Sequence, residues 1–282
     1  MHDGIEMMKK SVLFLFFYLF TVLPLSAKVI KVLTIGNSFA QDAVEQYLYE
    51  LAKAQGDSLV IGNAYIPGCS IDMHYDNLSK DKKAYEYRKV TKGNRLNRKK
   101  QSLKNIIRDE QWDYISFQQA SQLSGIASSF VNLGALKRLV MGYTTNLHVT
   151  YIWHMTWSYA EDFSDERFAP YDYNQRQMYS DIVSAMLNVL PGVGIKRIVP
   201  SGIAIQLGRY RLGNTMNRDG YHLSYTIGRF IAACTWCEFL TGKSVDGNSY
   251  RPDALTEEEV ITCQQIAHEA CYMQQRGSYT IF

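Results

Sequence analysis

The stretch that most constrains this chain is a short N-terminal segment in which an apolar run changes into a helical pattern at one turn. Residues 29–35 are mostly apolar and rich in β-branched side chains, which predicts a buried strand. Gly36 and Asn37 follow, and both tolerate the backbone conformations of a tight turn. Apolar residues then recur at helical spacing, at Val44, Tyr47, Leu48 and Leu51. We therefore expect Ser38 at the carboxyl edge of a sheet, near the positive end of a helix dipole.

A serine in that position suits nucleophilic catalysis, because backbone N–H groups at the turn can stabilise a developing oxyanion. The same Gly-x-Ser pattern also occurs in plain turns and in phosphate-binding loops, which use the same N–H groups. The fuller nucleophile-elbow pattern would have glycine where this chain has Ala40. The segment alone therefore leaves catalysis and an ordinary turn equally open.

The rest of the chain alternates between strand and helix patterns. Further strands are predicted at residues 58–66, 113–117, 148–154 and 196–199. Helices are predicted at residues 102–110, 129–141 and 173–190, and a capping box at Thr256 starts the last helix. This alternation predicts a parallel sheet with helices on both faces. Since no internal repeat or low-complexity tract interrupts it, we expect one domain over residues 28–282.

The first 27 residues have the layout of a secretory signal peptide. Lys9 and Lys10 precede an apolar run over residues 11–25, and Ser26 and Ala27 provide a small-residue exit. The uncharged run is short for a membrane-spanning helix. We expect this segment to be cleaved and the protein to be exported, either periplasmic or secreted. An uncleaved segment would be its only contact with a membrane.

Export makes disulfides possible, but the chain has five cysteines, an odd number. Cys234 and Cys237 lie inside an apolar helical run rather than at a helix start, which argues against a thioredoxin-like role. No second Cys-x-x-Cys is present to complete a zinc site. We expect most cysteines to be small core residues, with a bridge between the two C-terminal helices as the alternative.

The net charge of +3 gives the whole chain no general affinity for nucleic acid, and we predict no such partner. Residues 80–104 are different, because they hold 11 Lys and Arg against two acidic residues. Such a run usually forms a solvated face, here a hairpin with its turn at Gly93 and Asn94. The functional alternative is attraction of an anionic substrate or of an envelope surface.

Polar and aromatic candidates follow three of the predicted strands. Gly68 lies in the turn after the second strand, where its N–H can approach a ligand closely. Gln118 and Gln119 follow the third strand, and their amides could donate to an oxyanion or cap loop carbonyls.

Three further candidates, Trp153, His154 and Trp157, come at the end of the fourth strand. We expect them to bind substrate, since aromatic faces suit the C–H faces of sugars. Trp153 could equally belong to the core.

The remaining candidates are Asp219 and His222, three residues apart on a turn that runs into a helix. At that spacing the carboxylate can hold the Nδ1–H of the imidazole, which leaves Nε2 free to take a proton from a serine. An isolated Asp-x-x-His is a weak signal, because a helix cap beside a surface histidine has the same pattern.

In this order the motifs resemble those of the SGNH, or GDSL-like, hydrolase superfamily, and more closely its DUF4886-type branch from gut Bacteroidetes. They are IGNSF at residues 35–39, IPGCS at 66–70, WDYISFQQAS at 112–121, HMTW at 154–157 and DGYH at 219–222. The resemblance implies a flavodoxin-like three-layer α/β/α sandwich with five parallel strands. It also implies that Ser38 is the nucleophile, with His222 as its base and Asp219 orienting the imidazole.

The resemblance further implies an oxyanion hole built from the N–H groups of Ser38 and Gly68 together with a side-chain amide. The superfamily usually has Gly-x-Asn-Asp in its third motif, whereas this chain has Gln118 and Gln119. A glutamine amide, with Gln119 preferred, would therefore replace the asparagine.

The implied function is that of an exported serine esterase, without metal or cofactor, that removes small acyl groups from carbohydrates through an acyl-serine. Acetyl is the acyl group that we expect, and the partner is an acylated carbohydrate or another small ester. Two alternatives stay open. One is a non-catalytic glycan-binding protein on the same fold, which the third motif favours. The other is a thioesterase or lysophospholipase, for which the chain offers no clear apolar lid.

Overall fold

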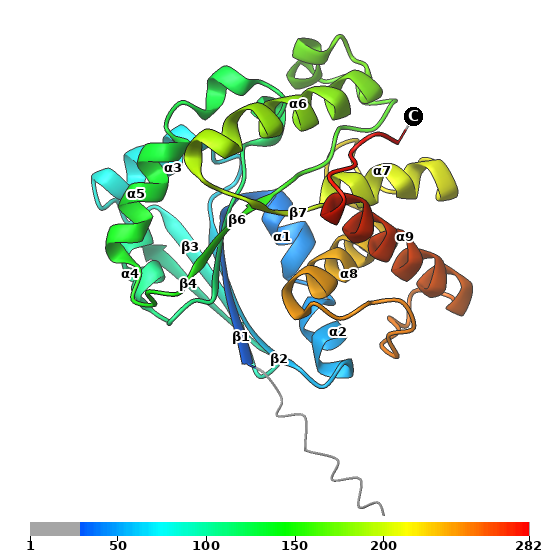
Figure 1. The fold of residues 1–282 in the computed structure, drawn as a ribbon, viewed down its shortest axis with the longest axis horizontal. Helices are drawn as coiled ribbons and strands as arrows, with labels where there is room; N and C mark the ends of the chain where they lie inside the picture. The colour runs from blue at the N-terminus through cyan, green and yellow to red at the C-terminus, as the bar shows by residue number, and fades with distance from the viewer. Residues whose placement is uncertain (1–28, 282) are drawn as a thin grey trace, which may run out of the picture.

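The computed structural model describes residues 29–281, and the predicted signal segment lies outside the described residues. Strand β1 (Val29–Gly36) lies inside the sheet, as its apolar run requires (Figure 1). It pairs in parallel with β2 (Ser58–Tyr65) on one side and with β5 (Tyr114–Phe117) on the other. The parallel pairing continues through β6 (Thr150–His154) to β7 (Arg197–Val199). These five strands confirm the predicted parallel sheet, in the 2-1-3-4-5 order of flavodoxin-like folds.

The sheet has seven strands rather than the five expected, because the basic segment adds a hairpin to its edge. Strands β3 (Tyr85–Thr91) and β4 (Asn94–Gln101) pair antiparallel to each other, and β3 pairs antiparallel to β2. Tyr85 and Tyr87 are buried, whereas β4 is exposed over almost its whole length. A charged and solvated edge strand of this kind discourages pairing with other chains.

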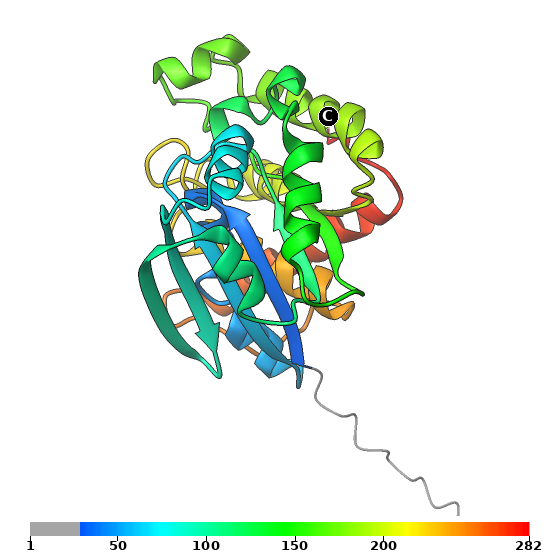
Figure 2. The same cartoon turned by 90° about the vertical axis from the view of Figure 1, so that its left-hand side faces the viewer.

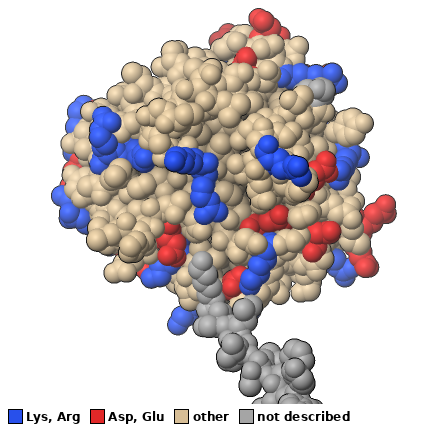
Figure 3. Space-filling model, viewed as in Figure 1, with Lys and Arg blue, Asp and Glu red and all other residues tan. Residues whose placement is uncertain are grey.

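Much of the hairpin's charge is neutralised within the protein. Lys89 forms ion pairs of 2.7 and 2.5 Å with Asp109 and Glu110. Arg88 and Arg95 both pair with the buried carboxylate of Glu45. Figure 3 shows the face of the molecule opposite the hairpin, where Lys and Arg form separate groups amid uncharged surface. The hairpin therefore fits the expected solvated face better than a concentrated anion-binding surface.

Helices cover both faces of the sheet and complete the three predicted layers (Figures 1 and 2). One face carries α1 (Ser38–Val44), α2 (Leu48–Ala54), α7 (Ser201–Leu212), α8 (Ile227–Thr241) and α9 (Glu257–Gln275). The other carries α3 (Ile71–Ser79), α4 (Leu103–Arg108), α5 (Leu133–Tyr143) and α6 (Gln175–Val193). Thr256 caps α9 with the capping box that the sequence predicts. Between residues 29 and 281, no helix is both long and apolar enough to cross a membrane.

The single helix predicted after Ser38 is wrong, because a break separates α1 from α2. Tyr47 has the left-handed φ of 69° at that break, a conformation that large side chains rarely adopt. Its ring packs edge-on against Phe230 of α8, and its hydroxyl donates to the carbonyl of Tyr225 at 2.7 Å. Tertiary contacts with α8 therefore offset the local cost of the break.

The five cysteines are buried with free thiols in the described structure, so the expected role as core residues is confirmed. Burial raises the pKa of the thiols of Cys69, Cys237 and Cys263 to about 12. Inert thiols of this kind contribute packing rather than chemistry. The alternative of a bridge between the C-terminal helices is wrong, since Cys234 and Cys271 are both free.

Candidate active site

The turn from β1 into α1 is as tight as the sequence predicts. A Cβ on Gly36 would lie 2.8 Å from the Cβ of Ala40 and 2.8 Å from Oε1 of Gln118, so only glycine fits. Asn37 caps α1, and its side-chain oxygen accepts from the N–H of Phe39 at 3.0 Å. Ser38 is the first residue of α1 and is half-buried, at the carboxyl edge of the sheet.

A network of buried, hydrogen-bonded side chains supports the turn from β1 into α1. Nε2 of Gln118 donates to Oδ1 of Asn37 at 2.8 Å, and Oε1 of Gln118 lies 2.9 Å from Nδ1 of His154. Burial lowers the pKa of His154 to about 3, so the imidazole is neutral and carries one proton. Because Oε1 can only accept, that proton lies on Nδ1, and the hydroxyl of Ser201 donates to Nε2 at 3.1 Å.

The two glutamines therefore do not fit the role of oxyanion donor that we predicted for them. Gln118 is 1% exposed, and its amide holds Asn37 in place. Gln119 accepts from the N–H groups of Ile71 and Ala120 at 3.0 and 2.9 Å. Its Nε2 donates to the carbonyl and the hydroxyl of Ser129, which uses both amide hydrogens. Both side chains position the loops around the site.

Three of the predicted site residues line one cavity of about 370 Å³. Ser38, Gly68 and His222 reach it from the ends of β1 and β2 and from the segment between α7 and α8. Gly68 has a φ of 59°, and a Cβ there would meet nothing within 4 Å, so no protein atom crowds the position of a side chain. The remaining lining residues are Asn37, Tyr65, Pro67, Ser121, Gln122, Arg167 and Tyr221.

Asp219 holds His222 in the geometry that the sequence predicts. Its Oδ2 lies 2.7 Å from Nδ1 of His222, and its Oδ1 accepts from the backbone N–H of His222 at 2.8 Å. Partial burial raises the pKa of the Asp219 carboxyl. Hydrogen bonds from the ring and backbone of His222 lower it by more, so the pKa lies below its ordinary value. The carboxylate therefore keeps the proton of His222 on Nδ1 and leaves Nε2 free.

The structure corrects the prediction that three residues at the end of β6 and just after it bind substrate. Trp153, His154 and Trp157 are 3%, 0% and 0% exposed, and they lie beneath the site rather than in the cavity. Trp157 stacks on Phe39 with 4.3 Å between ring centroids, and its Nε1 donates to the carbonyl of Tyr221 at 2.8 Å. These side chains support the reactive segments instead of contacting a ligand.

A buried carboxylate that the sequence analysis missed links the two halves of the site. Asp42, one turn after Ser38 in α1, is 0% exposed. Its Oδ2 accepts from the N–H of Leu223 at 2.8 Å, and Nη1 of Arg218 contacts both of its oxygens at 3.1 and 3.2 Å. Nη2 of Arg229 in α8 lies 2.5 Å from Oδ1. Asp42 thus ties the segment that bears His222 to the helix that begins with Ser38.

The cavity also contains side chains that no pattern in the sequence indicates. Arg167 lies in the 3-10 helix η3 (Glu166–Tyr171), with its guanidinium 4.5 Å from the ring centroid of Tyr221. Asp165 pairs with it at 2.7 and 3.0 Å. The loop after β6 brings this arginine to the cavity, and no periodic pattern in that loop could have predicted it. Within the described chain, no cluster of three His, Cys, Asp or Glu side chains could hold a metal ion.

The family to which the chain belongs follows from a match over nearly its whole described length. The model of the domain of unknown function DUF4886 matches residues 31–272. The chain belongs to the DUF4886 family. A DUF4886 family protein from Bacteroides uniformis has a crystal structure that matches with a TM-score of 0.85 at 45% identity. The match covers 87% of this chain and 96% of that one, which confirms the fold and the resemblance inferred from the motifs.

More distant structures resemble this DUF4886 protein at 13–14% identity and with TM-scores below 0.5. A putative SGNH hydrolase from Slackia heliotrinireducens matches with a TM-score of 0.48, over 75% of this chain and 98% of that one. A mutant acetyl-xylooligosaccharide esterase from Geobacillus Stearmophilus also has a TM-score of 0.48, with coverages of 77% and 95%. No curated protein matches the chain.

Proposed function

We propose that this DUF4886 protein is a serine esterase that acts through Ser38, His222 and Asp219. The observation that carries the proposal is the 2.7 Å contact between Asp219 and Nδ1 of His222, in a histidine that shares a cavity with Ser38. A carboxylate bonded to the histidine and a serine in the same cavity supply the groups of a proton-transfer triad.

In the proposed reaction, Oγ of Ser38 attacks the ester carbonyl while Nε2 of His222 takes its proton. Two backbone N–H groups stabilise the tetrahedral oxyanion. Ser38 opens α1, where the first N–H groups have no acceptor within the helix, and Gly68 lines the same cavity. The protonated His222 then gives its proton to the leaving alcohol, and water hydrolyses the acyl-serine in the second step.

For a third oxyanion donor we propose Gln122 in place of the two glutamines before it. Gln122 is half-buried and lines the cavity, whereas Gln118 and Gln119 use their amides on other protein groups. Its Oε1 lies 3.5 Å from the hydroxyl of Ser121, which leaves the amide nitrogen as the group available to a ligand. Removing one such donor typically lowers turnover by about 10²–10³-fold.

The substrate that we propose is a small acyl ester, acetyl above all, on a carbohydrate in the periplasm or outside the cell. Polar and amphipathic side chains line the cavity, including Tyr65, Ser121, Gln122 and Tyr221. They suit a polyhydroxylated alcohol and lack the continuous apolar surface that a long acyl chain would need. The thioesterase and lysophospholipase alternatives are therefore weaker.

A fluorophosphonate probe tests the proposal most directly, because only an activated serine reacts with it. We expect mass to be added at Ser38 in the native protein, and activity on acetate esters to exceed activity on C8 and C12 esters. The glycan-binding alternative is favoured by the engaged amides of Gln118 and Gln119. Absence of labelling together with measurable glycan binding would support it against the esterase.

A further inference from the structure

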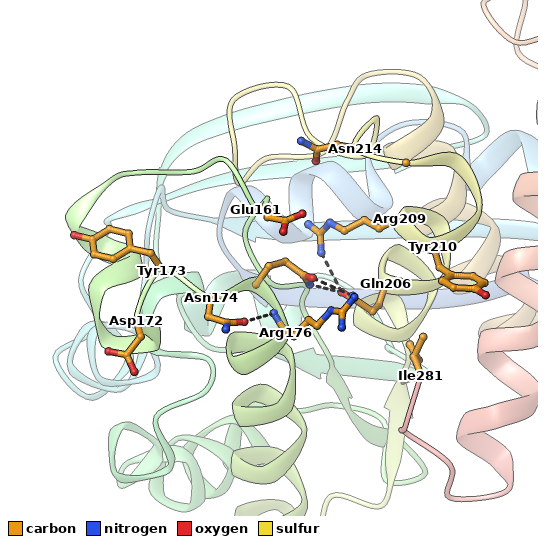
Figure 4. Close-up of a pocket in the computed structure, with 12 residues that line it drawn as sticks. Glu161, Asp172, Tyr173, Asn174, Arg176, Gln206, Arg209, Tyr210, Asn214 and Ile281 are labelled. Carbon is orange, nitrogen blue, oxygen red and sulfur yellow. Dashed lines mark hydrogen bonds between the residues drawn. The ribbon is translucent and has the colours of Figure 1, made fainter.

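Figure 4 shows a second cavity, of about 910 Å³. It shares no described lining residue with the cavity at Ser38. It forms where the loop after β6, the start of α6 and the end of α7 meet. A cavity of this volume falls within the size range of small-molecule sites.

Most of the residues that line the second cavity have polar side chains. Amides, carboxylates and guanidinium groups provide donors and acceptors together, and Ile281 is the only aliphatic side chain among the described lining residues. Tyr210 and Tyr173 stand at its edge, 80% and 46% exposed. Sugar hydroxyls both donate and accept hydrogen bonds, and sugar C–H faces pack on aromatic rings. The lining therefore fits a polyhydroxylated ligand better than an apolar one.

The floor of the cavity favours a neutral ligand over an anion. Nη1 of Arg209 donates to Oγ of Ser158 and to Oε1 of Gln206, and Nη2 donates to the carbonyl of Ser158 and to Oδ1 of Asn217. All four Nη hydrogens of Arg209 are therefore used by the protein. The lining also includes the carboxylates of Glu161 and Asp172, whose negative charges equal in number the positive charges of its two arginines. Neither sign of charge is in excess.

Two consecutive residues at the edge of the cavity have a strained backbone conformation. Asp172 and Tyr173 are consecutive residues with left-handed φ values of 52° and 53°. Such conformations cost free energy for residues other than glycine, and they cluster at ligand-binding sites. Here they end η3 and place Tyr173 next to Asn174, the N-cap of α6.

Hydrogen bonds connect this cavity to the reactive histidine. Nη2 of Arg209 donates to Oδ1 of Asn217 at 2.8 Å, and Nδ2 of Asn217 donates to the carbonyl of His222 at 3.3 Å. The loop after β6 also borders both cavities, since Glu161 lines one and Arg167 the other. A ligand in the second cavity would therefore contact residues that help to hold the first cavity in place.

We propose that the second cavity is a binding site for a neutral oligosaccharide, separate from the reaction cavity. The ligand class follows from the lining and from the engaged Arg209, not from the esterase reaction. The proposal can therefore fail or succeed independently of the proposed catalysis.

The test is calorimetric titration of the full-length mature Ser38→Ala protein with xylohexaose, cellohexaose and mannohexaose. In that background, Tyr210→Ala combined with Asn214→Ala removes two exposed lining residues, and thermal unfolding checks that the fold is kept. We expect at least one probe to bind, and the double substitution to weaken its affinity by at least about tenfold. Tyr272→Ala, an exposed tyrosine outside both cavities, should leave affinity unchanged.

Tyr65→Ala provides the second control, because Tyr65 lines the reaction cavity. Affinity should stay unchanged in this variant if the oligosaccharide occupies the second cavity. Three results would overturn the proposal. They are no binding by any of the three probes, binding that the double substitution does not weaken, and binding that only Tyr65→Ala weakens.

Discussion

The two halves of the reaction cavity are held in place in different ways. Ser38 lies where β1 passes into α1, and its neighbours in sequence shape the turn: Gly36 allows the close approach, and Asn37, itself held by the amide of Gln118, caps the helix. His222 lies in the segment between α7 and α8, and residues far from it in sequence hold that segment. Asp42 bonds to the N–H of Leu223 across 181 positions.

The comparison teaches that the turn of the proposed nucleophile depends mainly on local structure, whereas the segment of the proposed base depends mainly on tertiary contacts. A strand–turn–helix keeps its geometry through backbone conformation and a cap. A segment without regular structure depends instead on buried polar contacts, and each unpaired buried group is costly. The half that contains His222 should therefore be the more sensitive to distant substitutions.

The largest expected effect is the loss of the nucleophile itself. If Ser38 is the nucleophile, Ser38→Ala should lower kcat on p-nitrophenyl acetate by about 10⁶-fold, the loss that follows removal of the serine in subtilisin, because no acyl-serine can form. Ser38 is half-buried, and the side-chain change removes one oxygen, so the unfolding temperature should stay close to that of the native protein. Equal rates in the two proteins would remove Ser38 from the mechanism.

The next effect concerns the orientation of the base. Asp219→Asn keeps the shape of the side chain, but its amide can favour the wrong tautomer of His222, and kcat should fall by about 10³–10⁴-fold. Asp165→Asn is the matched control, since Asp165 pairs with Arg167 of the cavity and does not touch His222. A similar loss of kcat in both variants would show that the effect is not specific to the triad.

A distant substitution should separate the two halves of the cavity. Asp42→Asn leaves Arg218 and Arg229 without their carboxylate, which should lower the free energy of unfolding by about 3–5 kcal/mol. We also expect kcat to fall by about tenfold or more, because the loop that bears His222 loses its anchor. Both are measured by denaturant unfolding and by ester hydrolysis at a temperature where the variant is folded.

Asp57→Asn is the control for that experiment. Asp57 is also buried, and it forms a 2.7 Å ion pair with Lys243 away from the cavity. It should lose stability but keep its kcat. Native activity in folded Asp42→Asn would show that the loop does not depend on this anchor.

The smallest expected effect is a change in how stability depends on pH. His154 has a pKa of about 3 in the folded protein, against about 6.5 when exposed. Between these values the unfolded chain binds the extra proton, so stability falls as pH is lowered, by about 1.4 kcal/mol per pH unit. His154→Gln should therefore reduce the slope between about pH 6 and pH 4 by about one proton.

His148→Gln, at an exposed position just before β6, provides the comparison for this measurement. Denaturant unfolding at each pH measures the slope in the native protein and in both variants. An unchanged slope in His154→Gln would mean that the imidazole under the nucleophile turn is not held neutral. His74 also has a pKa lowered to about 3 by burial, so a residual slope should remain in both variants.

Several features could be predicted from the sequence because they have a period or a motif. The five parallel strands are apolar runs, and the contact of Asp219 with His222 follows from their spacing of three residues. Strand β4 of the hairpin has no apolar alternation, because it is an exposed and charged edge strand, so the sequence indicates only the turn that precedes it. No sequence pattern predicts the break between α1 and α2 at Tyr47, because tertiary contacts with α8 determine it.

The same distinction between local patterns and tertiary contacts applies to the residues of the site. Sequence alone determined that a serine would follow a buried strand and that an aspartate could hold a histidine, because both depend on residues close together in the chain. Only the tertiary structure decided that Trp157 supports the site from below, that Gln118 holds Asn37, and that Arg167 reaches the cavity. The physical reason is that burial and hydrogen-bond partners of these side chains are set by segments remote in sequence, which no local pattern records.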